Sequence, residues 1–128
     1  MDKTPAEKWK DTITGYRKKC KKIIDVSKSI RYAGVINEYG RTLTGIVRSG
    51  IKPMLKSEQV KNEFFIIATL MSLRKGHFNS VGNLEYVVLK HQKVSIVAYQ
   101  KNKITYYVSI DAKEKSLDKI IPKITKIV

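Results

Sequence analysis

The segment from Phe64 to Leu73 constrains the fold most, because it contains ten residues without a charge in a chain where 29% of residues are charged. On a helix, with 100° between successive residues, its apolar side chains point in nearly every direction instead of forming one stripe. This pattern predicts a helix that is buried on more than one side. Ten residues are about half the length that crosses a bilayer, so we do not expect a membrane span.

A helix of this kind needs cover on the side that does not face its own sheet. The simplest cover is a second copy of the same helix, supplied by a symmetric homodimer. Burial of the whole helix inside one three-layer domain is the alternative. For the dimer, the residues that we expect at the interface are Phe64, Ile67, Ala68 and Met71.

The charge of the chain is unusual for its size. The 128 residues suit one domain, residues 1–128, and they include 26 Lys and Arg against 11 Asp and Glu, a net charge of +15. Such an excess repels itself and indicates an anionic partner. The one cysteine, Cys20, allows no internal disulfide, and the chain opens without the apolar run of a signal peptide. We therefore expect a cytoplasmic protein.

Helix and strand signals alternate along the chain. Thr4 and Pro5 form an N-cap followed by a first-turn proline, so they predict the start of a helix. Ser57 is the expected N-cap of the central helix, and Ser116 that of a C-terminal helix. Segments rich in β-branched and aromatic residues predict five strands. These strands are Ile30–Ile36, Thr42–Val47, Leu84–Leu89, Val94–Tyr99 and Ile104–Ile110.

The first helix has an apolar arc about 100° wide, which is typical of an amphipathic helix lying on a core. Cys20 lies within this arc, and no histidine is placed locally to activate it. We therefore expect a small buried residue there, not a reactive thiol. The residues of the arc are Trp9, Ile13, Tyr16, Cys20, Ile23 and Ile24.

The order of these elements predicts the fold class. Gly40 can adopt the positive φ that a short hairpin loop demands, so the first two strands are expected to pair antiparallel. The last three strands are separated by short loops and are expected to form a meander. The predicted fold is α+β, in the order α-β-β-α-β-β-β-α, with three layers around a five-stranded antiparallel sheet. The central helix covers one face of this sheet and the terminal helices cover the other.

The segment Arg31–Leu43, with the sequence RYAGVINEYGRTL, and the order of elements after it resemble the roadblock/dynein-light-chain domain. This domain is a relative of the profilin, longin and PAS folds. The chain also looks like a small archaeal family of the same length. The roadblock resemblance implies a homodimer in which edge strands continue the sheet and the central helices pack antiparallel. It also implies a non-enzymatic platform that binds a small GTPase or assembles with like subunits. No site residue transfers from the resemblance.

Motifs for catalysis are missing from the sequence. It contains no phosphate-binding G-x-x-x-x-G-K-[ST] loop, no dinucleotide glycine fingerprint and no H-E-x-x-H pair. His77 and His91 lie in different loops without a Cys or carboxylate at ligand spacing, so we expect exposed imidazoles and not a metal site. The acidic residues are scattered among basic neighbours. We therefore expect no enzyme activity, no catalytic residues and no cofactor.

Two basic clusters support an alternative function, the binding of nucleic acid through phosphate contacts without sequence specificity. Tyrosines at positions 39, 99 and 107 are candidates for base stacking, although tyrosines on strands are more often packing residues. A PAS-like pocket for a small ligand between sheet and helix is a third possibility. For an anionic partner of any kind, the expected contact residues are Arg17, Lys18, Lys19, Lys21, Lys22, Lys90, Lys93, Lys101 and Lys103.

Overall fold

The computed structural model describes residues 2–128, and its elements follow the predicted order of helices and strands. The sheet has the strand order β2-β1-β5-β4-β3, and all neighbouring strands are antiparallel. β2 and β3 are therefore its two edges. The elements are α1 (Pro5–Ile24), β1 (Ile30–Ile36), β2 (Thr42–Val47), α2 (Ser57–Arg74), the 3-10 turn η1 (Lys75–His77), α3 (Phe78–Val81), β3 (Val87–Lys90), β4 (Val94–Lys101), β5 (Ile104–Asp111) and α4 (Leu117–Ile127).

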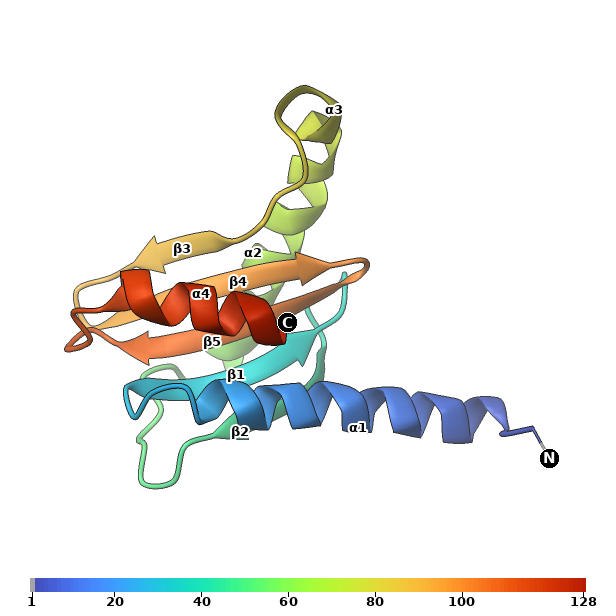
Figure 1. Cartoon of the computed structure of the whole chain (residues 1–128), viewed down its shortest axis with the longest axis horizontal. Helices are drawn as coiled ribbons and strands as arrows, with labels where there is room; N and C mark the ends of the chain where they lie inside the picture. The colour runs from blue at the N-terminus through green and yellow to red at the C-terminus, as the bar shows by residue number, and fades with distance from the viewer. Residues whose placement is uncertain (1) are drawn as a thin grey trace.

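The sheet is covered on both faces. α1 and α4 lie in front of it in Figure 1 and α2 lies behind it, so the predicted three-layer α+β architecture is confirmed. The alternation within the central strand β5 explains this arrangement. Tyr106 and Val108 join the core under α1 and α4, whereas Tyr107 between them joins the core under α2. A strand that is apolar on both sides has to lie between two layers.

The larger core lies between the sheet and the two terminal helices. Cys20 and Ile23 of α1 and Ile120 and Ile124 of α4 are buried there against residues of β1, β4 and β5. The prediction that Cys20 is a buried packing residue is confirmed. Tyr99 from β4 is also buried in this core, and its hydroxyl donates a hydrogen bond of 3.0 Å to the carbonyl of Ile121 in α4. This bond satisfies the phenol in an apolar setting.

The second core lies between the sheet and α2, and it corrects the predicted dimer interface. The four residues assigned to that interface are all buried against the sheet of their own chain. Phe64 contacts Tyr107 edge to face, with ring centroids 4.9 Å apart. A substitution such as Ile67→Lys would therefore disrupt the fold itself. The buried residues of α2 are Phe64, Ile67, Ala68 and Met71.

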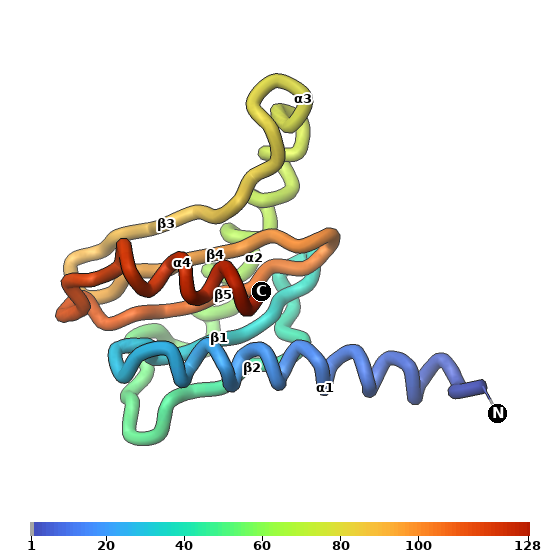
Figure 2. Tube along the Cα trace, viewed as in Figure 1, coloured from blue at the N-terminus to red at the C-terminus, as the bar shows by residue number. Residues whose placement is uncertain are grey.

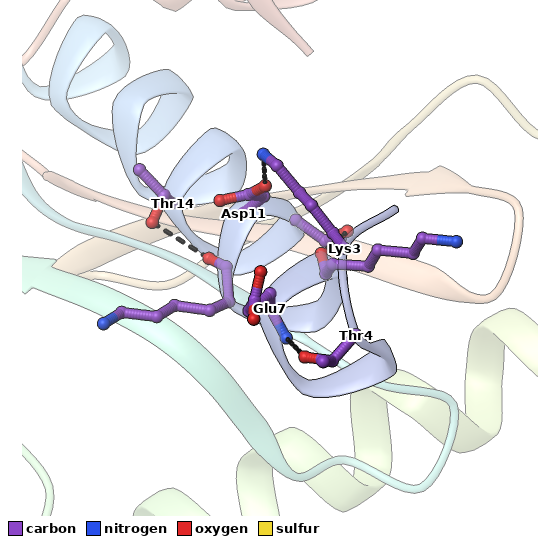
Figure 3. Close-up of polar contacts among 8 residues, drawn as sticks. Lys3, Thr4, Glu7, Asp11 and Thr14 are labelled. Carbon is purple, nitrogen blue, oxygen red and sulfur yellow. Dashed lines mark hydrogen bonds and ion pairs between the residues drawn. The ribbon is translucent and has the colours of Figure 1, made fainter. Parts of the chain in front are cut away.

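The helix ends follow from local hydrogen bonds. Figure 3 shows the start of α1, where the Thr4 Oγ1 accepts a hydrogen bond of 3.2 Å from the Glu7 N–H, as an N-cap should. Lys3 and Asp11 form an ion pair across the same turns. α2 differs from the prediction, because its N-cap is Lys56 and not Ser57. The Gln59 side chain accepts a hydrogen bond of 2.9 Å from the Lys56 N–H.

Two predicted details of the termini and edges are wrong. Trp9 belongs to the apolar arc of α1, yet it is 54% exposed, because the first turns of the helix extend past the sheet (Figure 1). β3 begins at Val87 and not at Leu84. η1 and α3 prolong the α2 region as far as Val81, and the chain then needs several residues to return to the sheet.

Tyr32 lies flat on the α2 side of the sheet, over two glycines that pair across β1 and β2. A Cβ built on Gly34 would lie 2.7 Å from the Tyr32 Cζ, and one built on Gly45 would lie 2.8 Å from the same atom. The missing side chains thus provide the space for the ring. Tyr32 in turn stacks on Phe64, with centroids 6.3 Å apart. The glycine pair therefore determines how the Tyr32 ring packs between the sheet and α2.

We predict that Gly34→Ala lowers the free energy of unfolding by about 1–3 kcal/mol, because the new methyl group displaces the Tyr32 ring from a packed core. Gly15→Ala is the matched control, since nothing lies within 4 Å of a Cβ at this helical position. It should stabilise the protein by up to about 1 kcal/mol. Urea unfolding followed by circular dichroism measures both. Equal stability of Gly34→Ala and the unmodified protein would contradict this account of Tyr32.

Candidate functional site

The outward side of α2 is apolar and lacks cover within residues 2–128. Ile66 and Leu73 lie seven residues apart, two turns along the same side of the helix, and they are 49% and 72% exposed. Phe65 beside them is also largely exposed. We call Phe65, Ile66 and Leu73 the α2 patch. Contiguous exposed apolar side chains of this kind mark interaction surfaces.

The C-terminal end of α2, which carries Leu73, lies toward a free sheet edge. Phe65 and Ile66 lie nearer the other side, because the Phe65 backbone packs on Gly40 of the β1–β2 turn and Ile66 lines a groove with Val47 of β2. β3 pairs with β4 on one side and has no strand on its other side within the described chain. Figure 1 shows α2 crossing behind the sheet and ending, with α3, beyond this edge. The backbone N–H and C=O groups along the outer side of β3 are therefore open to pairing with another strand. Val81, at the end of α3, is one more exposed apolar side chain.

The opposite edge, β2, is protected by a charged side chain. Arg17 from α1 donates through Nη1 to the carbonyl of Gly45 at 3.2 Å and to the Thr44 Oγ1 at 3.4 Å. A charged side chain bonded to an edge carbonyl hinders the addition of a further strand there. Arg17 is among the residues expected to bind an anionic partner, but in the structure its guanidinium donates hydrogen bonds within its own chain. The two edges thus differ, and β3 is the open one.

The predicted anion-binding residues do not form one patch. Lys90 and Lys93 flank the β3–β4 loop at one end of the sheet, where Val94 is opposite Asp111. The β4–β5 hairpin lies at the other end of the sheet, as Figure 2 shows, and it carries Lys101 and Lys103. The third group lies on the exposed side of α1. It comprises Lys18, Lys19, Lys21 and Lys22.

The tyrosines considered for base stacking divide between core and surface. Tyr99 and Tyr107 are buried, so neither ring can receive a base. Burial raises the pKa of the Tyr107 hydroxyl. This hydroxyl donates a hydrogen bond of 2.9 Å to the Oε2 of Glu63, and the Glu63 carboxylate raises the pKa further. Tyr39 is exposed on the β1–β2 turn. One exposed tyrosine does not make a stacking platform.

Residues 2–128 contain no cluster of side chains suited to holding a metal ion. Within residues 2–128 no three His, Cys, Asp or Glu side chains lie together in a way that could hold a metal ion. His77 and His91 lie in different segments, in η1 and in the β3–β4 loop. Among the described helices none has the length and apolar character that crossing a membrane requires.

The structure has a groove on the α2 side of the sheet. The sequence left a pocket between sheet and helix open as a third possibility, but it did not identify the residues that line this groove. The groove has a volume of about 940 Å³ and lies between the sheet, the first turns of α2 and the segment 48–56 that joins β2 to α2. Ile51, Met54 and Leu55 from this segment line it together with Ile66 of the α2 patch. No local motif signals such a groove, because its walls come from segments that are far apart in the sequence.

Comparisons with known proteins place this arrangement among known folds. No family model matches the sequence, and no curated protein matches it. The gliding protein MglB of Thermus thermophilus superimposes with a TM-score of 0.72 at 10% identity, over 90% of this chain and 84% of that chain. The Roadblock/LC7 domain from Streptomyces avermitilis gives 0.63 at 9% identity, over 85% and 88% of the two chains. An MglB described as having a tetrameric arrangement gives 0.71 at 11% identity, over 88% and 84%. The chain therefore has a roadblock-like fold.

The thiol of Cys20 should be unreactive in the folded protein. Burial raises its pKa from 9.0 to about 11, although the charge of Arg17 opposes part of this shift. The thiolate reacts and the thiol does not, and the higher pKa lowers the thiolate fraction about 100-fold at neutral pH. We predict no reaction with Ellman's reagent at pH 7.5 over minutes, and complete reaction in urea. Rapid labelling of the native protein would contradict the buried placement of Cys20.

Proposed function

We propose that this roadblock-like chain is a non-enzymatic interaction module, with residues 1–128 as one domain, and that it forms a homodimer through the α2 patch and the edge of β3. The dimer then acts as a platform for a protein partner in the cytoplasm, either a small GTPase or an acidic protein. The observation that carries this proposal is the exposed α2 patch, whose Leu73 is 72% exposed at the end of α2 that extends past the open β3 edge.

Symmetry supports a dimer of this geometry. A two-fold axis relates identical patches, so one β3 strand pairs antiparallel with the same strand of a second copy. Because α2 ends just beyond the β3 edge (Figure 1), the same axis can bring the two α2 patches together. One interface then covers both the apolar side chains and the free backbone groups. The fold likeness adds support, since one similar MglB is described as tetrameric.

The surface charge favours an acidic partner. The net charge is +15, and two ion pairs, Lys3 with Asp11 and Arg31 with Asp111, are found among the described residues. Most lysines therefore have no fixed partner within the chain. A partner with an acidic surface lowers the resulting repulsion and associates faster at low salt.

Leu73→Lys should weaken the dimer at least tenfold, because it removes a large apolar side chain from the interface and introduces a charge there. Leu73 is mostly exposed in the single chain, so the secondary structure should be unchanged. Sedimentation equilibrium across a concentration series measures the dissociation constant. Val47→Lys is the matched control, because Val47 is 58% exposed on the opposite edge strand, β2. A purely monomeric unmodified protein at high micromolar concentration would overturn the proposal, and so would a dimer that only Val47→Lys disrupts.

Nucleic-acid binding remains a second candidate function, favoured by one observation. Four lysines of α1, at positions 18, 19, 21 and 22, lie exposed within five residues of helix, and no carboxylate pairs with any of them in the described chain. Such a helix can contact successive phosphates.

If this helix binds duplex DNA, log affinity should fall with log salt with a slope near −0.9 for each phosphate contacted. Replacing Lys18, Lys19, Lys21 and Lys22 by Gln should then make the slope shallower by up to about 4. Fluorescence anisotropy of a labelled duplex gives both slopes. Absence of binding at about 50 mM salt excludes this second candidate, because phosphate contacts are strongest at low salt.

A further inference from the structure

The groove on the α2 side of the sheet is a shaped site with an ordered floor. Its floor includes Tyr32 from β1, Tyr107 from β5 and Phe64 from α2, and these rings pack on one another. The segment 48–56, the loop that leads from β2 to α2 in Figure 1, supplies the facing wall. A volume of about 940 Å³ is within the range of small-molecule sites.

Part of the accessible lining of the groove is aliphatic. Val47, Met54, Leu55 and Ile66 all line the groove and remain substantially exposed. The aromatic rings of the floor offer no free face, because the Tyr32 ring lies between the glycine pair on one side and Phe64 on the other. A flat base or cofactor ring therefore has nothing to stack on. Flexible aliphatic walls with a methionine suit an alkyl chain.

One end of the groove is positively charged. Arg31 and Lys93 both line the groove at this end, close to Asp111. The Arg31 Nη1 lies 4.0 Å from the Asp111 Oδ2. The Lys93 carbonyl accepts a hydrogen bond from the N–H of Ala112, the residue after Asp111. Arg31 also donates to the carbonyl of Lys52 at 2.8 Å, which fixes its position. Lys93 is exposed and has no ion-pair partner in the described chain.

The other titratable groups of the groove are His91, beside Lys93, and Glu63. Glu63 is the one carboxylate in the lining, and its Oε2 already accepts the hydrogen bond from the Tyr107 hydroxyl. The groove therefore combines an aliphatic channel with a cationic end.

We propose that this groove binds a free fatty acid, with its carboxylate at Lys93 and its alkyl chain along Met54, Leu55 and Ile66. The attraction between the carboxylate and Lys93 orients the ligand, and burial of the chain against aliphatic walls provides most of the affinity. Binding of this ligand needs only the single chain and not the dimer. Ile66 belongs to both surfaces, so a dimer would lie beside the mouth of the groove.

The test is a fluorescence titration of the full-length protein with parinaric acid, followed by displacement with dodecanoate below its micelle concentration and with uncharged dodecanol. We expect saturable binding of one parinaric acid per chain and displacement by both compounds. Lys93→Glu should weaken parinaric acid and dodecanoate binding roughly tenfold each and leave the dissociation constant of dodecanol unchanged, because only the carboxylates meet the new charge. Lys101→Glu is the matched control at the opposite end of the sheet and should change neither.

Met54→Asp tests the aliphatic wall, and it should weaken the binding of parinaric acid and of both competitors, because a carboxylate then faces the alkyl chain. Circular dichroism confirms that each variant is folded. The proposal is overturned if binding is absent, if it occurs only with phosphatidylglycerol vesicles, or if Lys93→Glu and Lys101→Glu have the same effect. It is also overturned if Met54→Asp leaves displacement intact but abolishes dimerisation, because the groove is then a protein interface.

Discussion

The structure depends on a central strand that is apolar on both sides. Tyr106 and Val108 of β5 face one core and Tyr107 faces the other, so the sheet has to be covered by two layers. α1 and α4 provide one layer. α2 alone provides the second, and one helix cannot cover the whole face of a five-stranded sheet. The groove beside α2 and the open β3 edge beyond it both follow from this incomplete cover.

The element order could be predicted because each element has a local signal. The β-branched runs in Ile30–Ile36 and Thr42–Val47 mark strands whose ends agree with the structure. The orientation of α2 could not be predicted. Its apolar residues point in all directions, so the sequence does not distinguish Phe64 and Ile67, which face the sheet, from Ile66 and Leu73, which face outwards. Contacts with β1, β4 and β5 decide this, and they are distant in sequence.

The candidate site was harder to predict than the fold for a related reason. Lysines close together in sequence remain on one helix face, but the meander carries Lys93 and Lys101 to opposite ends of the sheet. The arginines behave differently from the lysines. Arg48 donates to the carbonyls of Ile24, Ser27 and Ile30, and so ties the end of α1 to the sheet. A planar guanidinium suits this bridging of carbonyl groups, whereas Lys3 is the one lysine with an ion pair among the described residues.

The central claim is that a second copy covers the outer side of α2 and the edge of β3. Hydrogen exchange of the backbone amides, measured over a concentration series, tests this claim most directly. We predict that the outward amides of β3 (Val87–Lys90) are protected at high protein concentration and exchange rapidly on dilution, while those of β2 (Thr42–Val47) do not change. Exchange of β3 that is independent of concentration, or protection that appears at β2 instead, would contradict the account.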